Sequence, residues 1–377
     1  MSNRIECNSK EHTDNLHSQC LDLLRFPLAI VVLIVHVFST TGGILNDSFT
    51  HSQLLPEVQR LVDVFLRGQS VPVYYFISGY VFFLGKEFTK QTFLNKLKNR
   101  VGTLLIPYIV WNTITLLFTV CISFISFKGI ANKYSLDLSI PNILNCFWEY
   151  DGAIVGQKTN YGIPILGPTW FLRDLMVVVL CTPVLNFILK EKRGIFSICV
   201  FAFIWLYSNL YGFSMYFPSS ALFFFSLGAF MSINKMDMIQ KFGSVNLAAI
   251  ILYSIISILL YNLNKTDSVV AYLGLKSVNT FIGLIVLFNI SKYLLKKRYC
   301  KVNKLLASSS MFIYISHMII CGRILKLIFI LVNPHSQVAI FTCYIATIVI
   351  TLTILLSLFI ITKRYTPKLL TFITGRR

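Results

Sequence analysis

Long apolar runs recur along the whole chain and are separated by short polar segments. About 20 apolar residues in a helix, at roughly 1.5 Å each, cover the roughly 30 Å hydrocarbon core of a bilayer, so runs of this length predict membrane-spanning helices. Ten runs qualify, approximately over residues 20–41, 64–84, 101–126, 168–189, 194–211, 217–233, 245–263, 269–291, 304–331 and 337–362. The pattern therefore predicts an all-α, polytopic membrane helical bundle, with a transmembrane domain over 20–362 between a segment over 1–19 and a tail over 363–377.

Lysine and arginine gather in alternate loops of this expected bundle. They follow the second, fourth and eighth runs and fill the tail, at Lys86, Lys90, Lys96, Lys98 and Arg100, at Lys190, Lys192 and Arg193, at Lys292, Lys296, Lys297, Arg298, Lys301 and Lys304, and at Lys363, Arg364, Lys368, Arg376 and Arg377. Basic residues favour cytoplasmic loops, so both termini are expected to be cytoplasmic. The same orientation puts Arg25 near the cytoplasmic side and His36 toward the outer leaflet.

Composition fits a protein that is embedded in a membrane over most of its length. Of the 377 residues, 55% are hydrophobic and 13% are charged, with a mean hydropathy of +0.70, which excludes a soluble enzyme held by one anchor. The net charge of +19 then indicates membrane orientation and contact with anionic membrane lipid, and no nucleic acid is expected as a partner. The nine cysteines are scattered without a CxxC pair or a zinc-like Cys/His spacing, so no disulfide framework and no metal site are expected. Cys146 is expected to face outward alone.

The first apolar run carries two ionisable residues, Arg25 and His36, eleven positions apart. Eleven residues make almost three helical turns, so both side chains fall on one face, about 16 Å apart along the axis. Ionisable groups are costly in a bilayer, so a pair in register is expected to face a protein interior or a wet cavity. Taken singly, Arg25 also fits an anchor at the inner interface, and His36 a packing histidine. Asp22, three residues before Arg25, is its natural ion-pair partner.

Two histidines and a serine are candidates for chemistry. His36 is suited to take the proton of a hydroxyl as a general base, and Arg25 to hold an anion or an oxyanion. His317, in SSSMFIYISH, is the second candidate, although a hydrogen bond to a neighbouring helix explains it equally well. Ser78 lies in VPVYYFISGYVFF without the GxSxG elbow or adjacent base of a serine nucleophile, and the following Gly79 permits close helix approach.

Two charged clusters are candidates for binding. Lys96, Lys98 and Arg100 suit the phosphates of a cytoplasmic nucleotide cofactor, although an anchor at the positive inner face explains them too. Arg173 and Asp174 are expected close to the outer face, where they form either part of a substrate site or a local ion pair.

Five stretches follow one another in an order that is similar to a known family. They are LDLLR with a histidine eleven positions after its arginine, VPVYYFISGY, NRVGTLLIPYIVWN, GPTWFLRDL and SSSMFIYISH. Together they cover residues 20 to about 360. The chain resembles the membrane-bound acyltransferase family 3, which comprises bacterial integral-membrane O-acyltransferases of envelope polysaccharides and related acceptors.

This resemblance implies a reaction and a location. The implied donor is acetyl-CoA or another short acyl-CoA from the cytoplasm, with no metal. The implied acceptor is a hydroxyl of a cell-envelope saccharide outside a bacterial plasma (inner) membrane. Arg25 and His36 match the family's essential pair, with His36 as the base for the acceptor hydroxyl, and His317 joins them as a catalytic candidate.

The resemblance also assigns binding residues. Arg100, and more weakly Lys96 and Lys98, match the segment that engages the coenzyme A phosphates. Many members carry a second arginine a few residues later, whereas this chain has Gly102, Thr103 and Leu104. The candidates on the substrate side are Arg173, Asp174, Trp170 and Ser78.

Two other functions fit the same residues. Intramembrane histidine and arginine also mark proton-coupled pathways, so a transporter or exporter of a lipid-linked saccharide is the alternative. Such a protein typically shows paired spans broken by glycine or proline in matching halves, which this sequence lacks. A catalytically silent component of envelope assembly is the third possibility.

Overall fold

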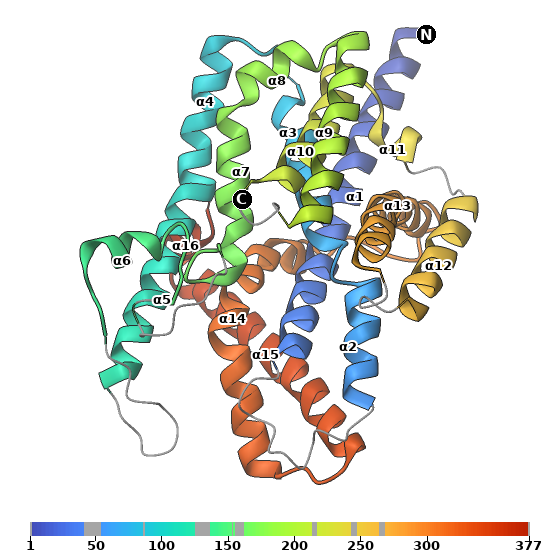
Figure 1. The fold of residues 1–377 in the computed structure, drawn as a ribbon. Helices are drawn as coiled ribbons and strands as arrows, with labels where there is room; N and C mark the ends of the chain where they lie inside the picture. Colours follow the sequence, from blue (N-terminus) through green and yellow to red (C-terminus); the bar gives the residue numbers. More distant parts are fainter. Residues whose placement is uncertain are drawn as a thin grey trace.

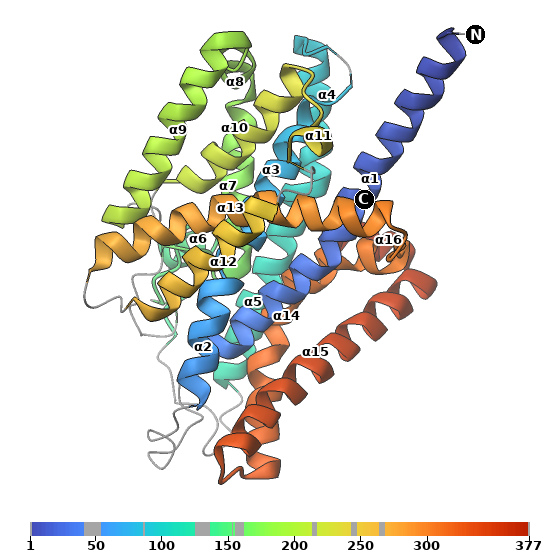
Figure 2. The same cartoon turned by 90° about the vertical axis from the view of Figure 1, so that its right-hand side faces the viewer.

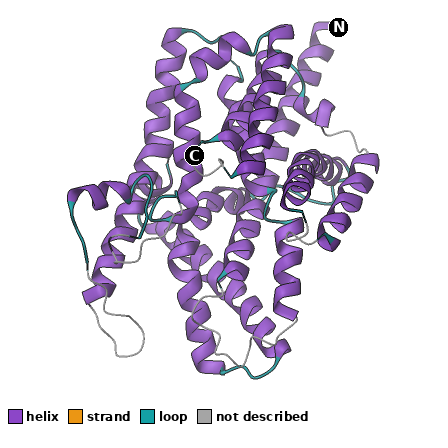
Figure 3. Cartoon of the chain, viewed as in Figure 1, coloured by secondary structure: helices purple, strands orange, loops and turns teal. Residues whose placement is uncertain are grey.

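The computed structural model describes residues 2–40, 54–85, 87–124, 136–152, 154, 162–212, 217–242, 247–263 and 268–375. These residues are almost entirely helical, and the only β pairing among them is an isolated bridge between Tyr150 and Ile163 (Figure 3). The helices are α1 (Ser2–Ser39), α2 (Leu54–Phe65), α3 (Ser70–Phe83), α4 (Lys90–Arg100), α5 (Ile106–Phe124), α6 (Ile140–Asn145), α7 (Trp170–Leu180), α8 (Thr182–Ile188), α9 (Glu191–Tyr211), α10 (Ser219–Ile233), α11 (Met238–Phe242), α12 (Leu247–Asn262), α13 (Val269–Lys296), α14 (Lys304–Val332), α15 (Gln337–Tyr365) and α16 (Pro367–Thr374).

Six helices in the described part of the chain are long and apolar enough to cross a membrane, and the bent pair α7–α8 makes a seventh if it counts as one span. The six are α1 from Leu16, the continuous helix Lys90–Ile122, α9, α13, α14 and α15. The chain is therefore a multi-pass membrane protein. Three of the ten expected spans, over 64–84, 217–233 and 245–263, coincide with the shorter helices α3, α10 and α12, of 14, 15 and 16 residues.

The run expected to span the membrane over 64–84 is divided between two helices. α2 ends at Phe65 and α3 begins at Ser70. Between them, Gly68 packs so closely on α13 that a Cβ there would lie 2.6 Å from Oγ1 of Thr280. A residue without a side chain is needed for this approach, and apolarity alone does not reveal the break.

The run expected over 101–126 begins earlier than predicted. The helix begins at Lys90, where Thr89 caps it by accepting a hydrogen bond from the backbone N–H of Thr92. It continues through a π-helical turn, Val101–Leu105, into α5. This wider turn comes just before Pro107, which cannot donate a backbone hydrogen bond. The basic residues of this stretch are therefore fixed on a helix, and they do not lie in a loop.

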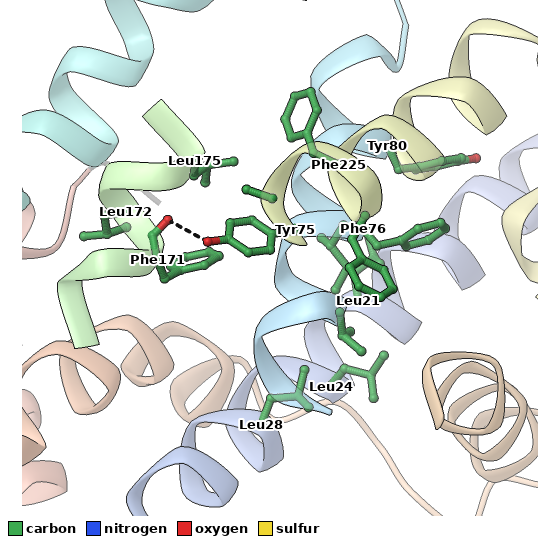
Figure 4. Packing of buried hydrophobic residues seen from close by; sticks show 14 of the residues in the cluster. Leu21, Leu24, Leu28, Tyr75, Phe76, Tyr80, Phe171, Leu172, Leu175 and Phe225 are labelled. Atoms are coloured by element: carbon green, nitrogen blue, oxygen red, sulfur yellow. Dashed lines mark hydrogen bonds between the residues drawn. The ribbon is translucent and has the colours of Figure 1, made fainter. Parts of the chain in front are cut away.

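Helices α3 and α10 cross in close backbone contact. A Cβ at Gly79 would stand 1.9 Å from the carbonyl oxygen of Phe225, and one at Gly228 would stand 2.1 Å from that of Phe76. The expected close approach at Gly79 is thus confirmed. Figure 4 shows Tyr75 of α3 pointing to α7, where its hydroxyl donates to the carbonyl of Phe171 at 3.5 Å, while Phe76 points to the other side. α3 is therefore fixed between two neighbours.

Helix α1 passes through the middle of the molecule and contacts α2, α3, α13, α14 and α15 (Figure 1). Figure 2 shows α13 lying across the direction of α9 and α10. Among the neighbours of α1, α14 makes the most extensive contact. This packing decides what surrounds the two ionisable residues of the first run.

Candidate active site

Arg25 of α1 borders a cavity of about 300 Å³, which we call the arginine cavity. Its lining comes from α1, α3, α4, the π-helical turn, α7 and α14, and comprises Arg25, Tyr74, Ile77, Ser78, Val81, Arg100, Thr103, Phe171, Ser310, Met311 and Tyr314. Nη1 of Arg25 donates to Asp22 at 2.7 Å, as the spacing predicts. The hydroxyl of Tyr74 donates to the backbone carbonyl of Arg25 at 2.6 Å. The guanidinium is thereby held at the cavity wall, with one side committed to a carboxylate.

A larger opening of about 770 Å³, the basic cleft, adjoins the arginine cavity. The two share Val81, Arg100 and Thr103 as lining residues. Lys96, Lys98 and Arg100 all line the basic cleft, so the structure brings the three cations of the expected coenzyme A segment together.

The cations of the basic cleft are held over an aromatic ring. The Lys96 ammonium and the Arg100 guanidinium lie 5.2 and 5.6 Å from the ring centroid of Phe82, and Lys96 also donates to the Phe82 carbonyl. Lys96 and Arg100 share a face because they are four positions apart on α4. Oγ1 of Thr103 is buried between the two cavities and has no hydrogen-bond partner among the described residues, which makes it available to a ligand.

His36 of α1 and His317 of α14 face each other, with ring centroids 5.1 Å apart and planes inclined by 44°. His317 is fully buried. Its Nδ1 lies 3.0 Å from the carbonyl of Ile313, one turn earlier on α14, and therefore donates to it. Its Nε2 then carries a lone pair and has no partner among the described residues.

The surroundings of His317 test the structural alternative for this residue. The expected alternative, a hydrogen bond to a neighbouring helix, is wrong, because the bond goes to its own helix. A buried nitrogen without a hydrogen-bond partner is costly. The histidine pair thus presents a proton acceptor without a resident donor.

Three aromatic rings line the arginine cavity, and one of them also adjoins the histidine pair. Tyr74, Phe171 and Tyr314 lie with mutual ring-centroid distances of 5.7 to 6.1 Å, and all three line the arginine cavity. On its other side the Tyr314 ring lies 6.4 Å from that of His317. The hydroxyl of Tyr314 donates to the carbonyl of Pro168 at 2.8 Å, which fixes the ring. We call these three residues the aromatic cluster.

A third opening, of about 390 Å³, lies beside the last turn of α1, next to His36 along the helix. This polar cleft is lined by Phe38, Ser39, Gln59, Arg60, Val62, Asp63 and Arg67. Arg67 donates to Ser39 Oγ at 2.7 Å and pairs with Asp63, which also receives Lys276 Nζ at 2.6 Å. Burial acts to raise the pKa of Asp63, but Lys276 and Arg67 outweigh it and hold that pKa below its ordinary value. The cleft therefore keeps an ordered, charged wall.

Arg173, Asp174 and Trp170, which are expected near the outer face, take part in contacts that hold α7 against its neighbours. Arg173 pairs with Asp174 at 2.9 Å, so the local ion pair is present, and both are buried. Arg173 also donates to the carbonyls of Trp148 and Gly162 at 2.7 and 3.0 Å, which holds the segments before α7 against that helix. The Trp170 ring lies 6.4 Å from that of Tyr75, within the packing of α3 against α7.

Ser78 lines the arginine cavity together with Arg25 and Arg100. One expectation needs correction, because Cys146 does not face outward but is fully buried. Burial raises the pKa of the Cys146 thiol to about 12, with the charge of Asp151 adding to the effect. The apolar cluster that covers this cysteine is formed in part by Leu116 of α5.

Sequence reasoning missed Thr103, Tyr74 and Tyr314 as lining residues. All three stand inside the stretches already singled out, but their neighbours come from helices far apart in the chain. Among the residues that the structure describes, no three histidine, cysteine, aspartate or glutamate side chains gather as they do around a metal ion.

Comparison with known proteins yields one match. A family model described as an acyltransferase domain, that of the acyltransferase family 3, matches residues 18–361. No curated protein and no solved structure matches the chain. The matched residues contain both histidines and the arginine cavity.

Proposed function

Because the chain belongs to the membrane-bound acyltransferase family 3, we propose that it transfers an acetyl or other short acyl group from cytoplasmic acyl-CoA to a hydroxyl of an extracytoplasmic cell-envelope saccharide. One observation carries the proposal. A basic cleft adjoins a cavity that contains Arg25, and beyond the aromatic cluster a histidine pair carries an open proton acceptor. A phosphate-bearing acyl carrier and an alcohol need these features in this order.

The donor end of the proposed reaction is the basic cleft. Lys96, Lys98 and Arg100 supply charge for the coenzyme A phosphates, and the unpartnered hydroxyl of Thr103 stands where the cleft meets the arginine cavity. A cavity of about 300 Å³ suits the pantetheine arm. The acyl thioester then points toward Tyr314 and the histidine pair.

Arg25 acts on the donor and not on the reacting carbonyl. It lies three turns of α1 from His36, about 16 Å along the axis, so one small group cannot touch both residues. Since Arg25 borders the arginine cavity and a guanidinium is suited to bind polar oxygen atoms through its forked donors, we assign it to positioning the donor arm.

His36 is the proposed general base. It takes the proton of the acceptor hydroxyl as that oxygen attacks the thioester carbonyl, the carbon–sulfur bond breaks, and the same proton returns to the sulfur, so that coenzyme A leaves as a thiol. The ring centroids of His36 and His317 lie 5.1 Å apart. Nε2 of His317 is therefore positioned to accept a hydrogen bond from the acceptor or from His36. The polar cleft beside Ser39 offers the acceptor an approach to His36.

The bent pair α7–α8, with its 60° break, is the feature that favours the alternative of saccharide export, because broken helices occur in transporters. Both functions are tested with the purified protein in lipid vesicles, supplied with isotopically labelled acetyl-CoA and envelope saccharide. Mass spectrometry of the saccharide should reveal a labelled ester that requires the protein. Passage of unmodified saccharide without acyl-CoA would contradict the proposal and support export.

A further inference from the structure

The last helix of the described chain, α16, lies beside α5 (Figure 1), and three of its residues line the basic cleft. The indole Nε1 of Trp111 in α5 donates to the carbonyl of Ile373 at 2.7 Å. Gly375, with φ of +77°, lies so close to the π-helical turn that a Cβ there would stand 2.7 Å from the Cα of Thr103. The residues of α16 lie beyond residues 18–361, which match the family domain.

Docking of α16 brings a fourth cation to the cleft. Lys368 lines it together with Lys96, Lys98 and Arg100, and Thr371 and Phe372 of the same helix line it as well. None of the described residues that line this cleft is acidic. Lys368 is exposed at the rim and takes no part in the ion pairs found among the described residues.

Four like charges around one opening repel one another, and a polyanion removes that repulsion. The diphosphate and the sugar phosphate of a coenzyme A carrier supply several negative charges within the size of the cleft, about 770 Å³. The cleft leads through Arg100 and Thr103 into the arginine cavity, so a bound phosphate group would be joined to an arm that enters the protein.

We propose that α16 completes the donor site and that Lys368 binds a phosphate group of the acyl-CoA donor. This inference rests on the proposed function. It also explains how the chain can bind the donor with Gly102 and Thr103, where many members of the family carry a second arginine. At Gly375 the absence of a side chain lets the end of α16 approach the backbone of Gly102 and Thr103 closely, which brings α16 to the cleft.

The test measures coenzyme A binding by isothermal titration to the full protein in nanodiscs of neutral lipid. Lys368→Ala should weaken binding about tenfold, the effect of losing one charge-assisted contact, and Lys368→Arg should restore most of it. The matched control is Lys363→Ala at the end of α15, outside the cleft, which should bind like the unchanged protein. Thermal unfolding of all four proteins should agree within a few degrees, because both side chains are exposed.

Three outcomes would overturn the inference in distinguishable ways. Equal binding by the unchanged protein and Lys368→Ala leaves the proposed function intact and removes Lys368 from the site. No coenzyme A binding by the unchanged protein removes the proposed donor as well. The third test uses nanodiscs with anionic lipid. If Lys368→Ala loses contact with the anionic lipid but binds coenzyme A as well as the unchanged protein does, the lysine binds a lipid phosphate.

Discussion

The histidine pair and the basic cleft differ in how far their polar groups are exposed to solvent. At the histidine pair, His317 is fully buried and keeps one nitrogen without a partner among the described residues. At the basic cleft, Lys98 and Lys368 are exposed, and the cations face an open space. A buried unpaired charge costs several kcal/mol, whereas a neutral imidazole can be buried at the cost of one hydrogen bond.

Because of this difference in exposure, we assign donor binding to one end of α1 and proton transfer to the other. The open end can hold a charged carrier without burying its phosphates, and the end with the buried His317 can accept a proton from a hydroxyl. Tyr314 lines the arginine cavity and also adjoins His317, so that only an uncharged arm needs to pass its ring. Substitutions at the two ends should therefore change different kinetic constants.

The largest effect is expected for His36→Ala. Loss of a general base lowers kcat by about 10²- to 10⁴-fold, while coenzyme A binding in the cleft should stay unchanged. The assay is acyl transfer at saturating donor. The matched control is His335→Ala, an exposed histidine in the turn between α14 and α15. An active His36→Ala protein would remove the general base from the mechanism.

A smaller effect, on the KM for acyl-CoA and not on kcat, is expected for Arg25→Lys. Lysine keeps the charge but not the forked geometry that pairs with Asp22 and faces the cavity at once. The KM for acyl-CoA should rise about 10- to 100-fold. Arg323→Lys on α14, whose guanidinium packs on Phe118, is the control. A fall in kcat with an unchanged KM would show that Arg25 acts on the reacting carbonyl.

The smallest effect is expected for salt, which should change donor binding at the basic cleft more than proton transfer at the histidine pair. Raising the ionic strength from about 0.1 to about 0.5 M shortens the Debye length from about 10 to about 4 Å, so the KM for the donor should rise about threefold. The kcat should change less than twofold, because His317 is fully buried and the proposed proton transfer to His36 does not involve the donor phosphates. Steady-state kinetics over this range, at constant pH, checks both numbers, and a salt-dependent kcat at constant KM would reverse the assignment.

Local pattern predicted the parts of the site that lie on one helix. The spacing of Arg25 and His36 places both on the face of α1 that meets α14, and the Asp22 pair follows from the same helical geometry. The close approach at Gly79 was also readable, because a glycine in an aromatic helix has few other uses.

Contacts between distant helices could not be read in this way. The partner of His36 comes from α14, and the burial of Cys146 depends on Leu116 of α5. Neither follows from periodicity, which reports which face is apolar and not which helix covers it. The proposed role of α16 could not be predicted for the same reason, since in the sequence Lys368 is only one of several basic residues in the tail.

The central claim is that one donor molecule reaches from the basic cleft, through the arginine cavity, to the histidine pair. It is tested most directly by cryo-electron microscopy of the protein with a ketone analogue of acetyl-CoA that cannot transfer its acyl group. The account predicts density for phosphates beside Arg100 and Lys368, for the pantetheine arm beside Arg25, and for the ketone next to Tyr314 within reach of the histidine pair. An analogue bound with its ketone directed away from α1, or at another face of the protein, would contradict it.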